Sequence, residues 1–498
     1  MLARSIPSDV YFASMTPKPS PFSSAERELL NAQDFSCDHT RPAFHFLPPA
    51  NWMNDPNGPI YHNGYYHVFY QHNPFADWWG DIHWGHARSR DLVQWEHQPI
   101  ALHPSRDRDE AHCYSGTCTI RPDGTPAILY TKVGPGGSEQ PFEQWLALGD
   151  SELRHWTKYE GNPVLSLDNH DGPSVLGDWR DPYLFEHQGA IFMVLGAVLC
   201  DRSEELAAVL LYRAHNDELT EWRFQSVLFS SPRYERRFLE CPNFIRLGNR
   251  WVLLVSPYHP VEYYVGELDH EQLQFHPKRK DRLDHSIDFY ASNAFTTPDG
   301  RLIVVGWISG FKKGLGWNGC LSLPREIELS EDNTLLQRPA RELTQLRDRE
   351  YHISCRRLRN RLERVPGLES TTLEIRARLR PSGAGRFGLR LRMGPSDNSG
   401  LEIALESDAA IVGGMKVRFA PEIEELVANR SAAEVDICLY LDNSVLELFL
   451  FDGRIAVTKI VEEPDDHLQV GVFADGELQL EEFRAWSLRP APVQGFPG

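Results

Sequence analysis

The sequence of 498 residues lacks any uninterrupted apolar run of the roughly 18 residues that a membrane-spanning helix needs. It also lacks an excess of positive charge, because 51 Lys and Arg residues stand against 70 Asp and Glu residues and give a net charge of −19. Nucleic acids and anionic membrane surfaces select basic faces, so this charge balance argues against both as partners. We therefore expect a soluble protein whose partners are small or neutral molecules.

Cysteine is scarce and dispersed: of the eight cysteines, only Cys113 and Cys118 lie close together. Their spacing without a second pair does not fit a zinc site, so we expect free thiols in a reducing compartment. The first residues show no apolar segment of the length typical of a secretory signal. Both observations favour a cytoplasmic protein, although export without such a signal leaves an extracellular location open.

Helical patterns are also scarce. Residues 23–33 predict one short helix, with Ser23 as the N-cap and Glu26 placed for a capping box, inside an N-terminal extension (1–40) to which we assign no chemistry. After this extension, strand and turn signals dominate. The dipeptide Asn63-Gly64, for example, stands between two strand-like runs and predicts a hairpin.

A short motif recurs about every 60 residues and ends each time in an aromatic residue. Its copies are 91–95, 152–156, 218–222 and 272–275, and each precedes a new strand pattern. A unit of about 60 residues with four short strands fits one blade of a propeller. We therefore predict an all-β protein with a five-bladed β-propeller over residues 41–335. A large β-sandwich is the alternative, but it does not require the recurring tryptophan.

The pattern changes after the propeller region. Residues 336–350 are expected to form a linker, and residues 351–498 show the longer alternating strands of a second all-β domain, a β-sandwich. The basic stretch 356–364 is interpreted as a solvated face of this domain, because the chain as a whole is acidic.

Three carboxylates share an unusual context, because a proline follows each within two residues. They are Asp55, Asp181 and Glu240. Proline disfavours the helical conformation of the preceding residue, so we expect these acids at strand ends or turns. Their separations correspond to about two blades and one blade of the repeat. Equivalent positions of different blades face the same central cavity, so we expect the three side chains to converge there.

Paired carboxylates are what the hydrolysis of a glycosidic bond requires. One must stay protonated to donate to the leaving oxygen, and the other must stay ionised to attack or stabilise the sugar cation. Their environments keep the two pKa values apart. We expect Asp55 to be the ionised group, because it lies among turn amides beside Asn54. Glu240 is expected to be the acid, because its neighbours in the sequence are apolar: Phe238, Leu239, Cys241 and Phe244.

Several aromatic residues follow the first of these acids. Sugar rings pack on indole faces, and Trp79, next to a glycine, is the candidate for such a contact, whereas we assign Trp84 to the core. His83 and His86 have the spacing of metal ligands. No third ligand is near in the sequence, so we interpret both as structural histidines.

Eight motifs, taken together, show that the chain resembles a known family. The motifs that carry the resemblance are residues 52–58, 70–74, 84–87, 114–116, 179–182, 240–242, 288–291 and 316–325. In this order they resemble the glycoside hydrolase family 32 enzymes, which comprise invertases, fructanases and related β-fructofuranosidases, and the match runs from about Arg41 to the end. Two departures are mild: Thr117 replaces a common serine and His72 a common tyrosine.

The resemblance implies a five-bladed propeller followed by a β-sandwich and a retaining mechanism. In this mechanism Asp55 attacks a terminal fructosyl unit, while Glu240 protonates the leaving oxygen and then activates water. Retention implies that their carboxyl groups lie about 5 Å apart. Asp181 stabilises the transition state. The implied substrate-binding residues are Asn54, Gln71, Trp79, Tyr114, Ser115 and Arg180, with Tyr290 and Trp307 as further candidates. The resemblance implies no metal and no organic cofactor.

The expected function is therefore the release of terminal β-D-fructofuranosyl units from sucrose or short fructans. A fructosyltransferase that uses the same intermediate is the alternative, and a non-catalytic sugar-binding protein is a third hypothesis. The expected partner is a small saccharide, with no nucleic acid and no membrane, and the oligomeric state is left open. The natural donor is also left open. A sucrose phosphate would need a basic residue on the leaving-group side, and the sequence does not place one.

Overall fold

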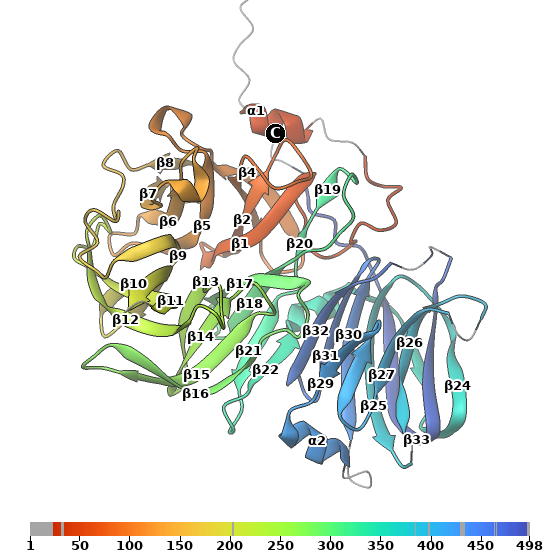
Figure 1. Cartoon of the computed structure of the whole chain (residues 1–498). Coiled ribbons are helices and arrows are strands. Elements are labelled where there is room, and N and C mark those ends of the chain that lie inside the picture. The colour runs from red at the N-terminus through yellow and green to blue at the C-terminus, as the bar shows by residue number, and fades with distance from the viewer. Residues whose placement is uncertain are drawn as a thin grey trace, which may run out of the picture.

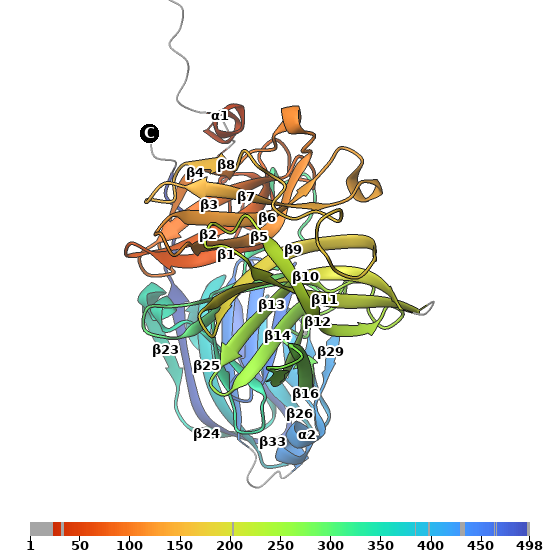
Figure 2. The same cartoon turned by 90° about the vertical axis from the view of Figure 1, so that its left-hand side faces the viewer.

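The computed structural model describes residues 23–30, 34–201, 204–383, 385–396, 399–428, 434–462, 464 and 466–495. The chain forms a five-bladed β-propeller followed by a β-sandwich, which confirms the predicted fold class (Figure 1). In the view turned by 90°, the propeller lies above and in front of the sandwich (Figure 2). Within the described residues, no helix is both long and apolar enough to cross a membrane.

Each blade is an antiparallel sheet whose strands follow one another from the propeller axis outward. The first blade comprises β1 (Asn51–His62), β2 (Tyr65–Asn73), β3 (His83–Ser89) and β4 (Trp95–Leu102). The second comprises β5 (His112–Ile120), β6 (Pro126–Val133), β7 (Glu143–Gly149) and β8 (Trp156–Lys158). The third comprises β9 (Val175–His187), β10 (Ala190–Asp201), β11 (Glu204–Ala214) and β12 (Trp222–Pro232).

The last two blades complete the ring. The fourth comprises β13 (Glu240–Leu247), β14 (Arg250–Ser256), β15 (Glu262–Asp269) and β16 (Gln274–Arg282). The fifth comprises β17 (Phe289–Thr296), β18 (Leu302–Ile308), β21 (Arg325–Leu329) and β22 (Leu335–Pro339), and β20 (Cys320–Leu321) also pairs with β18. The short strand β19 (Trp317–Asn318) pairs in parallel with β1, so the last blade is joined to the first by backbone hydrogen bonds.

The repeated sequence motif marks the turn before the outermost strand of a blade. Its leucines, Leu92, Leu153, Leu219 and Leu273, all have positive φ angles, between 53° and 62°. The aromatic residue that follows begins β4, β8 or β12, or is the second residue of β16. The motif therefore forms the same turn in each of these blades, and this is why its copies are separated by about the length of one blade.

Two local predictions concern short segments. The Asn63-Gly64 turn joins β1 to β2 with φ angles of 48° and 83°, as a tight hairpin of this sequence requires. Helix α1 spans Ser24–Leu30, and residues 31–33 of the predicted helix lie outside the described residues. The capping box is formed: the Glu26 amide donates to Ser23 Oγ (3.2 Å), and the Ser23 amide donates to Glu26 Oε2 (2.7 Å).

Short 3-10 helices occur at η1 (Arg106–Arg108), η2 (Gly137–Glu139) and η3 (Arg341–Leu346). Because β22 ends at Pro339 and the next strand begins at Arg347, we propose that the propeller extends to residue 339 instead of 335. On this division the connection to the second domain is 340–346, which is shorter than the expected 336–350.

The second domain packs its strands around one apolar core. Its elements are β23 (Arg347–Ile353), β24 (Arg356–Glu369), β25 (Thr372–Pro381), β26 (Arg386–Met393), β27 (Leu401–Leu405), β28 (Ala409–Val412), β29 (Met415–Arg418), α2 (Pro421–Ala428), β30 (Val435–Asp442), β31 (Val445–Leu450), β32 (Ile455–Ile460) and β33 (Gln469–Leu488). The long strand β33 pairs with β23, β24, β25 and β26. The chain then returns to the propeller, where Gln494 bridges to Glu96 of β4.

The two domains meet through a buried network of charged groups. His45 Nδ1 lies 2.7 Å from Asp442 Oδ2, and His45 Nε2 lies 3.1 Å from Glu447 Oε1. Arg325 Nη2 donates to Glu447 (2.6 Å) and to Asp284 (3.0 Å). All five side chains are inaccessible to solvent. Because His45 and Arg325 belong to the propeller side and their acceptors include two sandwich carboxylates, these charges hold the domains together.

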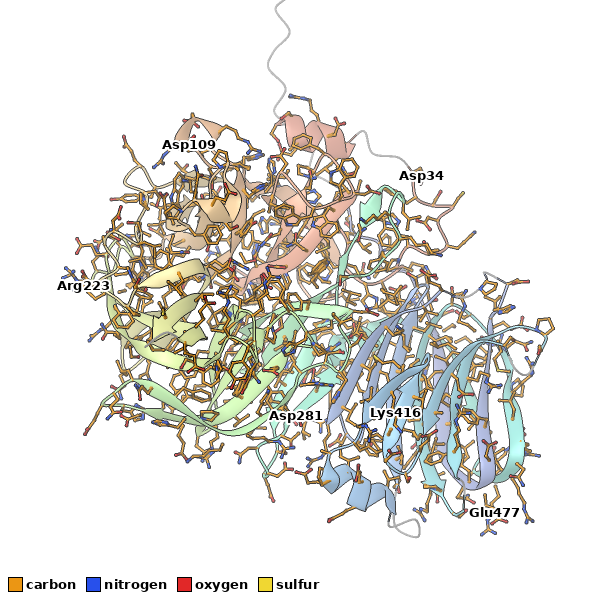
Figure 3. The ribbon with its side chains drawn as sticks, in the orientation of Figure 1. Asp34, Asp109, Arg223, Asp281, Lys416 and Glu477 are labelled. Carbon is orange, nitrogen blue, oxygen red and sulfur yellow. The ribbon has the colours of Figure 1, made fainter. Side chains whose placement is uncertain are left out.

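A cleft of about 610 Å³ also lies between the domains, and Asp281 and Lys416 lie on its two sides (Figure 3). Charged residues pair across it. Arg279 of β16 lies 3.6 Å from Glu422 of α2, and Arg454 donates to Asp332 at 2.9 Å. Ion pairs therefore connect the two domains at this cleft.

Candidate active site

The innermost strand of every blade is irregular where it passes the propeller axis. The interruptions in the ladders fall at residues 53–56, 113–116, 180–183, 240–243 and 290–293. Asp55 and Asp181 lie inside β1 and β9 at such bulges, so the expectation that they lie at strand ends or turns is wrong. Proline has no amide proton for the ladder, and the acid before it is left in a bulge while the strand continues. Glu240, by contrast, is the first residue of β13.

The bulges surround a cavity of about 390 Å³. It is lined by Asn54, Asp55, Gln71, Trp79, Tyr114, Arg180, Asp181, Glu240, Tyr258, Tyr290 and Trp307. The structure thus brings together all of the site residues that the sequence predicted except Ser115, which lies behind Asp55. Tyr258 was missed. It lies in a turn between β14 and β15, and nothing in the surrounding sequence distinguishes this turn from others.

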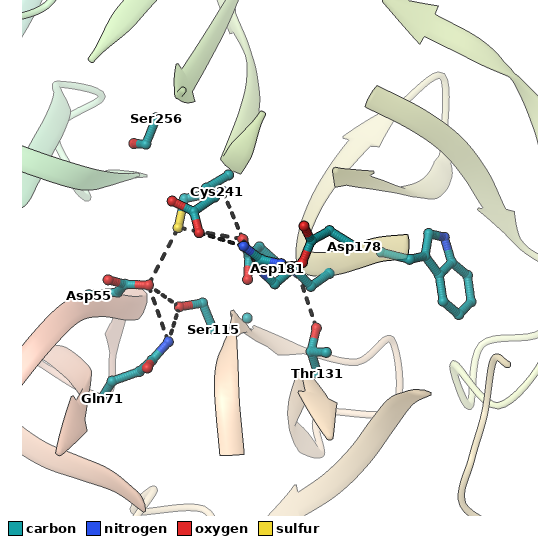
Figure 4. Close-up of polar contacts among 12 residues, drawn as sticks. Asp55, Gln71, Ser115, Thr131, Asp178, Asp181, Cys241 and Ser256 are labelled. Carbon is teal, nitrogen blue, oxygen red and sulfur yellow. Dashed lines mark hydrogen bonds and ion pairs between the residues drawn. The ribbon is translucent and has the colours of Figure 1, made fainter. Parts of the chain in front are cut away.

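Asp55 is held by side-chain donors (Figure 4). Ser115 Oγ donates to its Oδ2 (2.5 Å), Gln71 Nε2 donates to the same oxygen (3.1 Å), and Asn54 Nδ2 donates to Oδ1 (3.1 Å). The sequence predicted that backbone amides of a turn would surround Asp55. Within the described residues, the donors to its carboxyl group are two side-chain amides and a hydroxyl instead. The Asn54 amide is itself fixed, because Trp52 Nε1 donates to its oxygen at 2.8 Å.

Cys241 connects the first two acids, as Figure 4 shows. Its Sγ lies 3.6 Å from Asp55 Oδ2 and 3.8 Å from Asp181 Oδ2, and its amide donates to Asp181 Oδ2 at 3.0 Å. The Asp181 amide donates to Thr131 Oγ1 (3.0 Å), which anchors the bulge of β9 on the neighbouring blade. Asp181 and Cys241 both have positive φ angles, 66° and 47°. Sequence reasoning treated Cys241 only as an apolar neighbour of Glu240.

Glu240 has polar partners, so the apolar environment expected for it is wrong. Arg180 Nη2 donates to Oε1 at 2.6 Å, and the Tyr290 hydroxyl contacts Oε2. The expected apolar neighbours Phe238 and Leu239 are fully buried in the core. The side chain of Glu240 lines the cavity instead. Proximity in the sequence therefore does not describe its environment.

The hydroxyl of Tyr290 has a single proton and three neighbours. It lies 2.8 Å from the carbonyl oxygen of Ser256, accepts from the Tyr258 amide at 2.9 Å, and contacts Glu240. If Glu240 is ionised, Tyr290 donates to it. If Glu240 is protonated, it donates to Tyr290, and Tyr290 donates to Ser256. Both protonation states of Glu240 therefore have hydrogen-bond partners, which suits a group that must alternate between acid and base.

Burial controls the electrostatics of the other two acids. It raises the pKa of Asp55, against the hydrogen bond from Ser115, and the nearby Glu240 raises it further. Burial also raises the pKa of Asp181, to about 7, although Arg180 opposes the shift. Arg180 is the common counter-charge, since it contacts Asp178, Asp181 and Glu240. The site therefore keeps three carboxyl groups together with one guanidinium.

Trp79 and Trp84 differ in exposure, and the two histidines near them contact different groups. Trp79 is 46% exposed, and its ring lies 5.1 Å from that of His112 and 6.2 Å from that of Tyr114. Trp84 is fully buried in the core, as predicted. His83 contacts the Asp81 carbonyl oxygen (2.6 Å), whereas His86 contacts His67 (2.9 Å). The two histidines thus have separate partners.

Comparisons with known proteins agree over most of the chain. A family model described as "Glycosyl hydrolases family 32 N-terminal domain" matches residues 45–339, and "Glycosyl hydrolases family 32 C terminal" matches residues 342–487. The sucrose-6-phosphate hydrolase of Escherichia coli is 31% identical over 479 residues, which cover 90% of this chain and 94% of the relative. The raffinose invertase of Escherichia coli is 31% identical over 473 residues, with 90% and 95% covered. A solved structure, a β-fructofuranosidase of Bombyx mori, is 28% identical with a TM-score of 0.76 and covers 95% of this chain and 99% of its own.

Proposed function

Because the chain belongs to glycoside hydrolase family 32, we propose that its cavity releases terminal β-D-fructofuranosyl units by a retaining, two-step reaction. The protein is a fructosyl-releasing hydrolase, a β-fructofuranosidase. Sucrose, short fructans and sucrose 6-phosphate are its candidate donors. The observation that carries the mechanism is the meeting of three carboxyl groups in one cavity, each with different partners.

In the first step the Asp55 carboxylate attacks the anomeric carbon of the fructosyl unit. The bond from this carbon to the leaving oxygen breaks, and the Glu240 carboxyl proton moves to that oxygen, which leaves an ester between the fructosyl unit and Asp55. The donors Ser115, Gln71 and Asn54 hold the attacking carboxylate in one orientation. This fixed geometry lowers the barrier, because little orientational freedom is lost during the attack.

In the second step a water molecule attacks the same carbon and gives a proton to the Glu240 carboxylate. The ester bond to Asp55 breaks, and both acids return to their initial states. Arg180 and Tyr290 stabilise the ionised form of Glu240 that this step needs. The alternative partners of Tyr290 accommodate the protonated form.

Asp181 is proposed to stabilise the transition state. The sugar carbon carries positive charge when the glycosidic bond breaks, and a buried carboxylate acts on such a charge more strongly than one in water. The Cys241 amide and Arg180 orient Asp181 toward the cavity. Asn54, Gln71, Tyr114 and Trp79 are proposed to form the fructose-binding wall.

The test is turnover by the purified full chain on sucrose, 1-kestose, inulin and levan, followed as released fructose. Asp55→Asn and Glu240→Gln should each lower kcat by at least about a thousandfold, since groups that act as a unit fail together. Asp123→Asn, which removes an exposed carboxylate at a turn that does not line the cavity, is the matched control. Inactivity of the wild-type protein on every β-fructoside would contradict the proposal.

The stereochemistry has its own measurement. In a mixture of water and methanol, retention yields methyl β-D-fructofuranoside, whereas inversion yields the α anomer. The α anomer as the first product would contradict the roles of Asp55 and Glu240. Oligosaccharides as the main products at high sucrose concentration would show that a sugar replaces water in the second step, which is the transferase alternative.

A further inference from the structure

The leaving-group side of the cavity can be located from the partners of Glu240. This acid protonates the leaving oxygen in the proposed reaction, so residues grouped around it face the leaving group. Tyr258 is one of them: its hydroxyl lies 2.9 Å from Arg180 Nη2, and its amide donates to Tyr290. Both contacted residues are partners of Glu240. The side chain of Tyr258 is 44% exposed, so its ring reaches from the acid to the opening of the cavity.

An arginine lies on this ring. The guanidinium carbon of Arg237 is 5.1 Å from the centre of the Tyr258 ring. Arg237 belongs to the segment 233–239, which joins β12 to β13, and its side chain is exposed. The segment therefore places a cation beside the leaving-group side of the cavity, three residues before Glu240.

Arg237 differs from the other two arginines of its segment. Arg233 forms an ion pair with Glu205, and Arg236 donates to Glu262 (2.7 Å) and Glu235 (2.9 Å). In the described part of the chain, Arg237 forms no ion pair and no side-chain hydrogen bond. Its N–H donors are therefore free for a ligand, whereas those of Arg233 and Arg236 are engaged.

The charge of the cavity makes a free cation at this place significant. Three lining residues carry carboxyl groups, of which Glu240 is protonated before the first step, and Arg180 is the lining residue that carries positive charge. Arg180 is already engaged with Asp178 and Glu240. A substrate with a phosphate group would meet net negative charge unless another cation received it. A guanidinium suits this role, because its planar pair of N–H donors matches two oxygens of a phosphate.

We propose that Arg237 binds a phosphate group carried by the leaving group, so that the enzyme prefers a phosphorylated disaccharide, such as sucrose 6-phosphate, to sucrose. The inference rests on the proposed function, because it uses Glu240 to locate the leaving group. It supplies the basic residue that a phosphorylated donor requires. The stacking of Arg237 on Tyr258 restricts the guanidinium to the rim while its edge stays open to the phosphate.

The experiment compares kcat/KM for sucrose 6-phosphate and for sucrose in wild type, Arg237→Gln and Arg237→Lys. We expect Arg237→Gln to lose about tenfold or more in the ratio of the two values, since a charged hydrogen bond to phosphate is removed. Arg237→Lys should lose less, because it keeps the charge. Arg233→Gln removes one charge from the same segment and is the matched control, which should keep the wild-type ratio.

Two further measurements separate binding from a merely structural role. Glucose 6-phosphate, the leaving group of the phosphorylated donor, should inhibit wild type more strongly than glucose does, and Arg237→Gln should lose this difference. Added salt should weaken turnover of sucrose 6-phosphate by wild type but not turnover of sucrose, because screening acts on the charged contact.

Each outcome decides the inference. A wild-type enzyme without preference for sucrose 6-phosphate, or an Arg237→Gln variant with the wild-type ratio, overturns it. Equal losses on both substrates also overturn it, because they mean that Arg237 only supports the Tyr258 ring. Failure of the wild-type protein to hydrolyse any β-fructoside refutes the proposed function instead. Thermal unfolding of each variant identifies misfolding, and in that case the inhibition of wild type by glucose 6-phosphate decides.

Discussion

The stability of the protein should fall between pH 6.5 and pH 9 because of one buried histidine between the domains. Each ring nitrogen of His45 faces a carboxylate, Asp442 Oδ2 at 2.7 Å and Glu447 Oε1 at 3.1 Å. A neutral imidazole has one N–H and would direct a lone pair at one of these carboxylates, so the geometry requires the charged form. Burial lowers the pKa of His45, but the hydrogen bonds to Asp442 and Glu447 and the negative charges of these two groups together outweigh it and raise the pKa to about 9.

The magnitude follows from the difference between folded and unfolded states. A shift from 6.5 to about 9 corresponds to about 3 kcal/mol at 1.36 kcal/mol for each pKa unit. Because the folded pKa is the higher one, this contribution is present in full below pH 6.5. It is lost as the pH rises from 6.5 through 9, where the folded protein also releases the proton. Since His45 is inaccessible to solvent, salt should screen the effect only weakly.

The assay is urea unfolding of wild type and His45→Gln from pH 6 to pH 9.5. The free energy of unfolding of wild type should fall by about 3 kcal/mol more than that of the variant across this range, because the variant has no imidazole at position 45 to release a proton. His39→Gln, at an exposed histidine nearby in the chain, is the control and should keep the wild-type slope. Equal slopes for wild type and His45→Gln would refute the reasoning, as would an NMR titration of His45 near pH 6.5.

Three further predictions concern the site. Cys241→Ala removes the sulfur between Asp55 and Asp181 and should lower kcat about tenfold with a displaced pH profile, whereas an unchanged profile would show that the sulfur only fills space. Tyr290→Phe removes the hydroxyl that contacts Glu240 and Ser256; it should lower kcat at least tenfold and shift the limb of the kcat–pH curve that reports the acid, and Tyr61→Phe, at an exposed tyrosine, is the control. Burial raises the pKa of Asp181 from 3.8 to about 7, so stability falls as the pH rises between these values, and the full cost of the ionised form is present at pH 8. Asp181→Asn should therefore unfold at a higher temperature than wild type at pH 8 while losing activity, and a lower unfolding temperature would be the contrary result.

The repeat and the site residues could be predicted from the sequence because they depend on local chemistry. The turn before each outer strand needs a positive φ angle at Leu92 and its equivalents, and this requirement is met by a local motif. Asp55 and Asp181 are recognisable by the proline that follows them. Their convergence then follows from the length of the blade, since equivalent positions of a closed ring face one axis.

The environment of Glu240 could not be predicted in the same way. Its neighbours Phe238 and Leu239 precede β13 and are buried in the core, whereas Glu240, the first residue of that strand, lines the cavity. Its partners Arg180 and Tyr290 come from two other blades. Tyr258 and Arg237 were missed for a similar reason, because their contact depends on two turns whose relative placement no local pattern encodes.

The bulges explain how so many polar groups reach one small cavity. In a regular strand, consecutive side chains point to opposite faces, so two adjacent residues cannot both face the axis. Asn54 and Asp55 both line the cavity, and so do Arg180 and Asp181. A bulge places two residues opposite one and removes this restriction. Pro56 and Pro182 follow the two acids and withhold the amide that a regular ladder would use. The prolines therefore help to set the composition of the site, because they let each strand present an acid together with its neighbour.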